Sequence, residues 1–277
     1  MNLTPLVLFL SLMSEIGGIA RAQSLNQPAS TDTPQIRDFY GYRLEEFTYR
    51  GLAAKVAEPK QVAAGNPWVW RARFWNHEPQ ADTALLRRGF HIAYYDVVDL
   101  YGNREAIQHW NAFYRLMRRR GLARKVALEA FSRGGLYAYN WAASHPKQVA
   151  CIYADAPVLD IRSWPGGLGI GPGSPQDWVK CRAAWHLDTD EDVQAFRGSP
   201  LDQVQAIVRG GYPLLHVCGE ADEVVPISEN TDLFEQRIRS AGGTITVIRK
   251  PGVKHHPHSL TDPTPIVNFI LKAYHLL

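Results

Sequence analysis

The chain has 277 residues, of which 45% are hydrophobic and 21% charged, and a formal net charge of +3. This composition is that of a globular protein whose core is large enough to need no disulfide or metal for stability. The charge is too small to indicate a nucleic-acid partner, and the only dense basic cluster, Arg118 to Arg120, lies where we predict a helix end, at which cations are favourable.

Residues 1–22 are typical of a secretory signal peptide. An apolar run from Leu3 to Met13 precedes Ala20-Arg21-Ala22, a pattern of small residues at which such signals are cleaved. The segment lacks a basic residue at its start and has Glu15 after the apolar run, and the run is too short to span a bilayer. We therefore predict cleavage, a secreted or periplasmic protein, and no stable membrane association afterwards; a retained anchor is the alternative.

Residues 23–36 are polar and are predicted to be a flexible leader, and residues 37–277 to be one domain of alternating strands and helices. Strands separated by helices imply parallel pairing with right-handed crossovers, so the predicted fold class is α/β, with a doubly wound, mostly parallel sheet. The expected strands are 44–49, 52–56, 68–74, 91–97, 126–131, 148–154, 212–218 and 244–249, and the expected helices are 104–119, 134–144, 228–240 and 265–274.

Residues 162–197 interrupt this alternation. A loop rich in Gly and Pro, 164–174, is followed by a helical stretch that contains Trp178 and Trp185. Because the segment lies between two predicted core strands, we expect a small cap inserted above the sheet.

The sequence around Ser132 predicts a nucleophile. Ala130-Phe-Ser132-Arg-Gly134 follows a predicted strand and precedes a helix, and it differs from G-x-S-x-G only by Ala130 in place of the first Gly. That motif makes a sharp strand-to-helix turn that exposes the serine Oγ, and small residues on both sides relieve the crowding. An ordinary helix N-cap serine is the alternative interpretation.

Two later motifs supply a carboxylate and a histidine. Asp222 lies in Gly219-Glu-Ala-Asp222-Glu-Val-Val-Pro226, directly after a predicted central strand, where sites of open α/β sheets are found. His255 lies in Pro251-Gly-Val-Lys-His255-His256-Pro-His258, between the last predicted strand and the last helix. His256 and His258 are alternatives for the histidine, and Asp155, at the end of another strand, is an alternative for the acid.

These motifs resemble those of the α/β-hydrolase superfamily, in particular the small prolyl-oligopeptidase-like and esterase-like serine hydrolases, over residues 40–277. The chain order Ser, Asp, His is the order of that fold. The resemblance implies a triad of Ser132, Asp222 and His255, and the family spacing of Gly, two residues, then His favours His255 over the other two histidines.

The same resemblance implies an oxyanion hole and a substrate-binding surface. The backbone N–H of Arg133 is one expected donor, and the loop near Trp75, Asn76 and His77 is expected to supply the other. Trp185 in the cap is an expected substrate contact. Aromatic rings near arginines can hold a sugar ring and a carboxylate, although such residues also pack in cores and pair with acids; the residues in question are Trp68, Trp70, Trp75, Trp164, Trp178, Trp185, Arg71 and Arg73.

The sequence thus predicts an exported serine hydrolase that cleaves a carboxylic ester of a carbohydrate or another small molecule. A serine peptidase with the same triad and an inactive binding protein on the same fold are the alternatives. We expect no cofactor and no metal. A zinc site would be another explanation of the histidine cluster, but no ligand motif of fixed helical spacing accompanies it.

Overall fold

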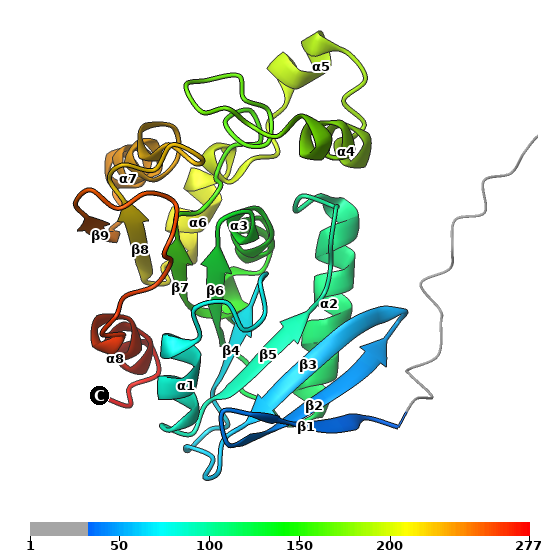
Figure 1. The fold of residues 1–277 in the computed structure, drawn as a ribbon, viewed down its shortest axis with the longest axis vertical. Helices are drawn as coiled ribbons and strands as arrows, with labels where there is room; N and C mark the ends of the chain where they lie inside the picture. The colour runs from blue at the N-terminus through cyan, green and yellow to red at the C-terminus, as the bar shows by residue number, and fades with distance from the viewer. Residues whose placement is uncertain (1–32) are drawn as a thin grey trace, which may run out of the picture.

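The computed structural model describes residues 33–277, which form a single sheet covered by helices on both faces (Figure 1). The predicted signal peptide and most of the predicted leader lie outside the described residues. The last two residues of that leader, Gln35 and Ile36, are the first two of strand β1. Within residues 33–277, no helix has both the length and the apolar character needed to cross a bilayer.

The sheet has nine strands in the order β1-β2-β3-β5-β4-β6-β7-β8-β9. Strands β1, β2, β3 and β5 pair antiparallel, and β5, β4, β6, β7, β8 and β9 pair parallel. This confirms the predicted α/β class with a mostly parallel sheet. The strands are β1 (Gln35–Phe39), β2 (Tyr42–Tyr49), β3 (Leu52–Glu58), β4 (Trp68–Arg71), β5 (His91–Tyr95), β6 (Val126–Phe131), β7 (Val149–Asp155), β8 (Leu214–Gly219) and β9 (Thr246–Lys250).

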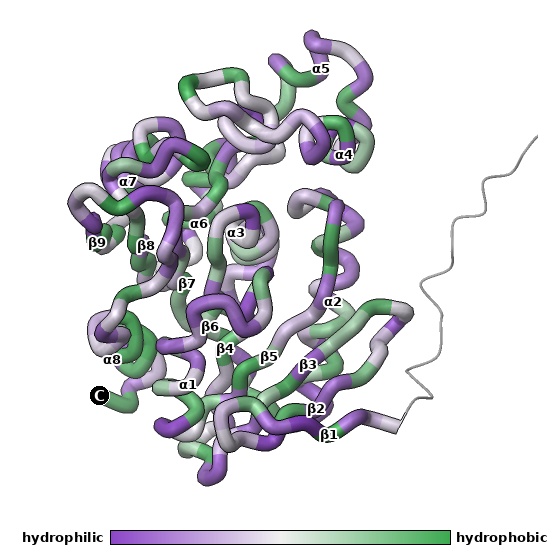
Figure 2. Tube along the Cα trace, viewed as in Figure 1, coloured by the Kyte–Doolittle hydropathy of each residue, from purple (hydrophilic) through white to green (hydrophobic). Residues whose placement is uncertain are grey.

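Two hydrophobic layers lie on opposite faces of the sheet. One packs α2, α3, α6 and α7 against it, and the other packs α1 and α8 (Figure 1). Hydrophobic residues are dense along the central strands and on α8 (Figure 2), as expected for strands covered on both faces. The helices are α1 (Gln80–Leu86), α2 (Arg104–Arg119), α3 (Gly134–Ser144), α4 (Pro175–Trp185), α5 (Asp190–Ala195), α6 (Val204–Gly210), α7 (Thr231–Ser240) and α8 (Thr264–Ala273).

The predicted elements differ from these mainly where elements are short. Helices α1, α5 and α6 have six or seven residues each and were not predicted, because fewer than two full turns carry little periodicity. Strand β4 ends at Arg71 rather than at residue 74, and Phe74 has a φ of 57° that a strand does not allow. The chain therefore leaves the sheet three residues earlier and forms a longer loop above it.

The expected cap segment contains α4 and α5, which lie beyond the carboxyl end of β6 and over α3 (Figure 1). The helical stretch predicted around Trp178 and Trp185 is α4. Its start is fixed by Ser174, whose side chain accepts a hydrogen bond from the backbone N–H of Asp177.

Candidate active site

The candidate site is built on the carboxyl ends of parallel strands. Ser132 directly follows β6, Asp222 follows β8, and His255 follows β9. Because parallel strands end at the same edge of a sheet, these three loops meet above it. The positions are those that the sequence predicts.

Ser132 lies in the bend between β6 and α3 with a φ of 47°, a left-handed conformation that is uncommon for a residue other than Gly. The tight turn also requires glycine behind it. A Cβ at Gly135 would lie 2.6 Å from the carbonyl oxygen of Val158, whereas a Cβ at Gly134 would meet nothing closer than 3.3 Å. The sequence motif requires a small residue at Gly134, but the more crowded position in the structure is Gly135.

The side chains of Ser132, His255 and Asp222 form one chain of contacts. The Ser132 Oγ lies 3.1 Å from His255 Nε2, and His255 Nδ1 lies 2.7 Å from the Asp222 carboxylate. The other oxygen of Asp222 accepts hydrogen bonds from the backbone N–H groups of Val224 and Val225, both at 2.9 Å. A carboxylate only accepts here, so Nδ1 carries the proton and Nε2 faces the hydroxyl with its lone pair.

The loops that carry Asp222 and His255 lie directly against each other. The backbone N–H of Ala221 donates to the carbonyl of Val253 over 2.9 Å. Gly219 makes this approach possible, because a Cβ there would lie 2.2 Å from the Val253 carbonyl oxygen and 2.3 Å from that of Lys254.

Asp155, the alternative acid, belongs to a different pair. Its Oδ1 lies 2.9 Å from His258 Nδ1, and both side chains are almost fully buried. Its Oδ2 accepts hydrogen bonds from the hydroxyl of Tyr153 and from the backbone N–H of Ser259. A second histidine–carboxylate pair therefore lies beside the first, and the ring centroids of His255 and His258 are 4.9 Å apart.

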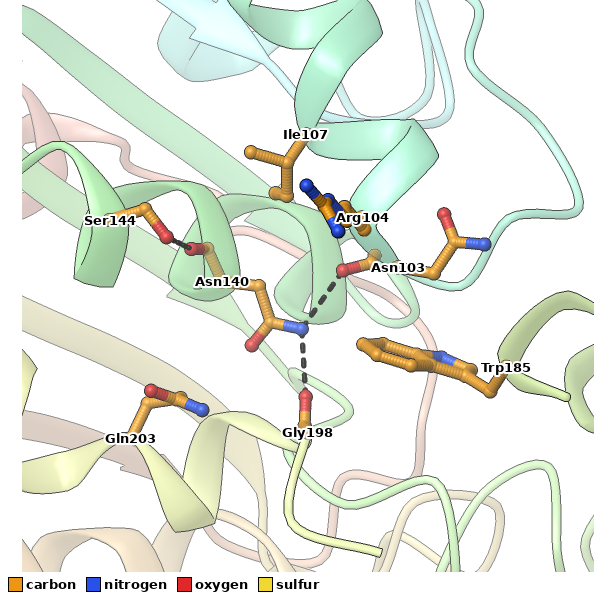
Figure 3. A pocket seen from close by; sticks show the side chains of 9 residues that line it. Asn103, Arg104, Ile107, Asn140, Ser144, Trp185, Gly198 and Gln203 are labelled. Atoms are coloured by element: carbon orange, nitrogen blue, oxygen red, sulfur yellow. Dashed lines mark hydrogen bonds between the residues drawn. The ribbon is translucent and has the colours of Figure 1, made fainter. Parts of the chain in front are cut away.

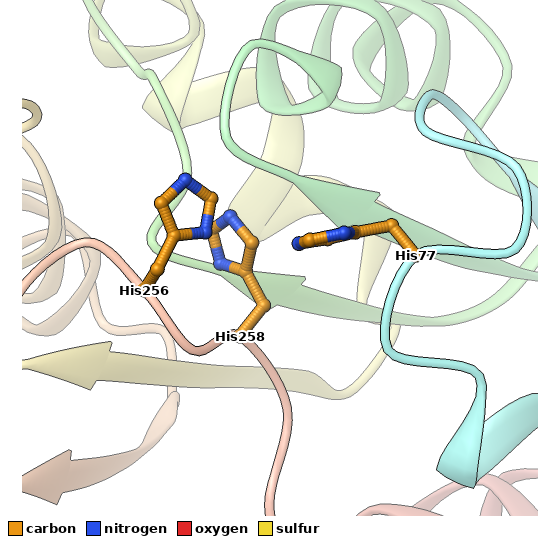
Figure 4. A group of neighbouring side chains, drawn as sticks. All are labelled: His77, His256 and His258. Carbon is orange, nitrogen blue, oxygen red and sulfur yellow. The ribbon is translucent and has the colours of Figure 1, made fainter.

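His256 and His258 also meet a residue of the expected oxyanion loop that the sequence does not relate to them. His77, in the loop after β4, has its ring centroid 5.5 Å from that of His256 and 5.6 Å from that of His258 (Figure 4). No local signal relates His77 to the other two, because the β4 loop and the β9 loop are far apart in the chain.

Arg133 connects the bend at Ser132 to the cap. Its guanidinium lies 3.1 Å from Asp177 of α4, and it stacks over the rings of Phe74 and Trp164. Burial opposes the charge of Asp177, but hydrogen bonds from Tyr101 and Ser174 and the charge of Arg133 hold the pKa of this carboxyl below its usual value. The backbone N–H of Arg133 donates to no other residue within 33–277.

The two predicted donors in the β4 loop take different positions. Trp75 packs against Phe39 and Tyr94, with ring centroids 4.8 and 5.8 Å away. Asn76 is exposed and has a φ of 63°. The structure therefore places both in the loop above β4, with the Trp75 ring turned to a hydrophobic cluster.

Arg71 holds this loop from below. Its guanidinium is buried against Asp82 and Glu129 and donates to the carbonyl oxygens of Phe74 and His77. Burial, followed by the nearby charge of Asp82, raises the pKa of Glu129 well above its usual value, which favours its protonated form.

Part of the expected sugar-binding surface is buried in the structure. Trp68, Trp70 and Arg71 are each at most 1% exposed, so none of them contacts a substrate. Trp70 instead stacks on Trp110 of α2, with ring centroids 4.1 Å apart. Arg73 pairs with Asp96 over 3.2 Å.

Trp185 lines a pocket of about 280 Å³ between the cap, α2 and α3 (Figure 3). Its indole N–H donates to the carbonyl of Tyr101, and its ring packs against Phe196. Opposite Trp185, Asn140 donates to the carbonyls of Gly102 and Gly198. The lining of this pocket includes none of Ser132, Asp222 and His255.

No model of a known protein family matches the chain, and no curated protein matches it in sequence. The structure is similar to several solved structures. It aligns over 88% of this chain with a puromycin-hydrolyzing peptidase of Mycobacterium tuberculosis (TM-score 0.58, 15% identity) and over 81% with an acylaminoacyl peptidase (TM-score 0.57, 14% identity). The chain spans 39% and 38% of those two proteins.

A third similar structure has the size of this domain. Est1E from Butyrivibrio proteoclasticus aligns over 88% of this chain and 100% of its own, with a TM-score of 0.59 and 17% identity. At these identities the likeness concerns the fold. Together with the strand order and the serine bend after β6, it identifies the architecture of this chain as the α/β-hydrolase fold.

Proposed function

We propose that the protein is a serine hydrolase, with Ser132 as nucleophile, His255 as general base and Asp222 as the carboxylate that orients it. The observation that carries this proposal is the continuous contact from Ser132 Oγ through His255 to Asp222, at 3.1 and 2.7 Å. An inactive binding protein would not need a buried acid, a histidine and a strained serine in this alignment.

The residues act in the following order. His255 Nε2 accepts the proton of Ser132 as Oγ attacks the carbonyl carbon, and Asp222 stabilises the resulting imidazolium. The same proton then passes to the leaving group, which leaves an acyl group on Ser132. His255 next activates a water that hydrolyses the acyl group. The backbone N–H of Arg133, which donates to no other residue within 33–277, stabilises the oxyanion, with a second donor from the loop after β4 near Trp75, Asn76 and His77.

For the substrate, we propose a carboxylic ester of a carbohydrate or another small molecule. The support is local: Trp164, Phe74 and the Arg133 guanidinium lie together beside Ser132, and aromatic rings with a cation suit a sugar or an anionic group. Peptide hydrolysis is the second candidate, because two of the similar structures are peptidases. We also propose that the protein is exported, on the signal pattern of residues 1–22.

A fluorophosphonate probe tests the activity, since it labels only a serine that an adjacent base activates. We expect one label per chain, at Ser132, and none in Ser132→Ala. Labelled protein that retains full turnover would contradict the proposal. Parallel assays on acylated sugars, small aryl esters and peptide anilides separate the ester and peptide candidates, and N-terminal sequencing of exported protein should begin at Gln23.

A further inference from the structure

Three histidines converge beside the candidate triad without being part of it. His77 comes from the loop after β4, and His256 and His258 come from the loop after β9 (Figure 4). Each of the three rings has one nitrogen atom that lies within 4.8 Å of a ring nitrogen of both other histidines. Imidazole nitrogen is a donor that zinc, copper, iron and nickel bind, so three such nitrogens gathered from two separate loops form a candidate donor set.

The most buried of the three has one ring nitrogen held by a carboxylate. His258 is 3% exposed, and its Nδ1 lies 2.9 Å from the carboxylate of Asp155. A carboxylate that accepts from Nδ1–H fixes the tautomer and leaves the lone pair on Nε2, which is the arrangement that carboxylate–histidine–metal sites use. Asp155 cannot turn away, because Tyr153 and Ser259 also hold it.

The other two histidines have the freedom to complete the site. Zinc binds imidazole nitrogen at about 2.0 to 2.1 Å, so tetrahedral ligand nitrogens lie roughly 3.3 Å apart. The nitrogens lie within 4.8 Å of one another, a wider limit than that, but His256 is exposed and His77 lies in a loop, so metal binding requires these two side chains to move closer to His258.

We propose that His77, His256 and His258 bind a zinc ion, with a fourth position left open to water or to a substrate oxygen. Three neutral imidazoles without a thiolate suit zinc and similar borderline cations rather than calcium or magnesium. The ion joins the loop after β4 to the loop that carries His255, so it stabilises both where they meet above the sheet. The inference does not depend on the hydrolase proposal. It differs from the sequence-based expectation, which was that the protein binds no metal.

Isothermal titration of chelator-treated, dialysed full-length protein with zinc chloride tests the site. We expect one ion per chain, at least a tenfold weaker affinity in His77→Ala and in His256→Ala, and a zinc-induced rise in melting temperature that is smaller in these two variants than in the wild type. His275→Asn, which changes an exposed histidine at a left-handed position that Asn tolerates, should bind zinc as the wild type does.

Two further measurements keep the result decisive. Circular dichroism of each variant shows whether it is folded, and His258→Ala is avoided because it would leave the buried Asp155 unpaired. Ser132→Ala should bind zinc normally, which separates this site from the proposed triad. No binding by the wild type, unchanged affinity in both folded histidine variants, or an equal loss in His275→Asn would each overturn the proposal.

Discussion

Arg133 and Asp177 form an ion pair of 3.1 Å that joins the residue after the candidate nucleophile to the first turn of cap helix α4. The pair lies at the surface of the site, with side chains 27% and 22% exposed, so its own contribution to stability is small. Its effect is positional, because Asp177 also accepts from Tyr101 and thereby fixes α4 over the bend at Ser132.

The first prediction concerns this link. Asp177→Asn should lower the free energy of unfolding by no more than about 1 kcal/mol. It should raise KM for a large acylated sugar several-fold and leave kcat/KM for a small aryl ester within about twofold, since a small ester does not reach the cap. Steady-state kinetics on the two substrates check this. An equal effect on both would show that the ion pair acts on the nucleophile rather than through the cap.

The second prediction concerns the nucleophile itself. Ser132→Ala should lower kcat by more than about 10³-fold, as removal of a triad member does in serine hydrolases. The melting temperature should not fall, because the variant loses one hydroxyl at a strained position. Turnover of an aryl ester that survives in a folded variant would exclude Ser132 from the mechanism.

The third prediction uses the close approach at Gly219. In Gly219→Ala, the new methyl group meets the carbonyls of Val253 and Lys254 and displaces the loop that leads to His255. We expect kcat to fall at least tenfold with a smaller change in KM, because Asp222 and His255 no longer align. Kinetics and a thermal melt on the purified variant measure both effects. Wild-type kcat would mean that the two loops tolerate separation.

The fourth prediction concerns stability in acid. His216 is fully buried between Tyr139 and Thr231, and burial lowers its pKa to about 3. In the unfolded chain its pKa is about 6.5, so the unfolded state binds the extra proton as the pH falls below that value. Because of this histidine, the free energy of unfolding decreases as the pH falls from 6.5 to about 3, by up to about 1.4 kcal/mol per pH unit.

His216→Gln removes the titrating group and with it this pH-dependent loss of stability. The difference in free energy of unfolding between wild type and variant should be largest at pH 7, where the wild type keeps its hydrogen bonds, and should shrink as the pH falls. Urea unfolding at several pH values measures it. A difference that stays constant from pH 7 to pH 4 would show that His216 is not the group that titrates.

Much of the site was predictable because its signals are local. Ser132, Asp222 and His255 each follow a strand within a short motif, and the topology of a parallel sheet brings such positions to one edge. The burial of Trp70 and Arg71 was not predictable in the same way. A strand with adjacent Trp and Arg residues has the same sequence pattern whether its side chains face solvent or are covered by helices. The contact of His77 with His256 and His258 was not predicted, because these residues lie in separate loops that only the folded chain brings together.

The buried Arg71–Asp82 ion pair and the partly exposed Arg133–Asp177 ion pair respond differently to added salt. The side chains of Arg71 and Asp82 are at most 1% exposed, so dissolved ions screen their attraction little, and we expect Arg71 to keep its hydrogen bonds to the carbonyls of Phe74 and His77 when salt is added. The Arg133–Asp177 pair is open to water and weakens as salt is added. Concentrated salt should therefore weaken the contact between the cap and the bend at Ser132, while the loop above β4 keeps its conformation. As the salt concentration rises, we expect affinity for large substrates to fall before affinity for small ones.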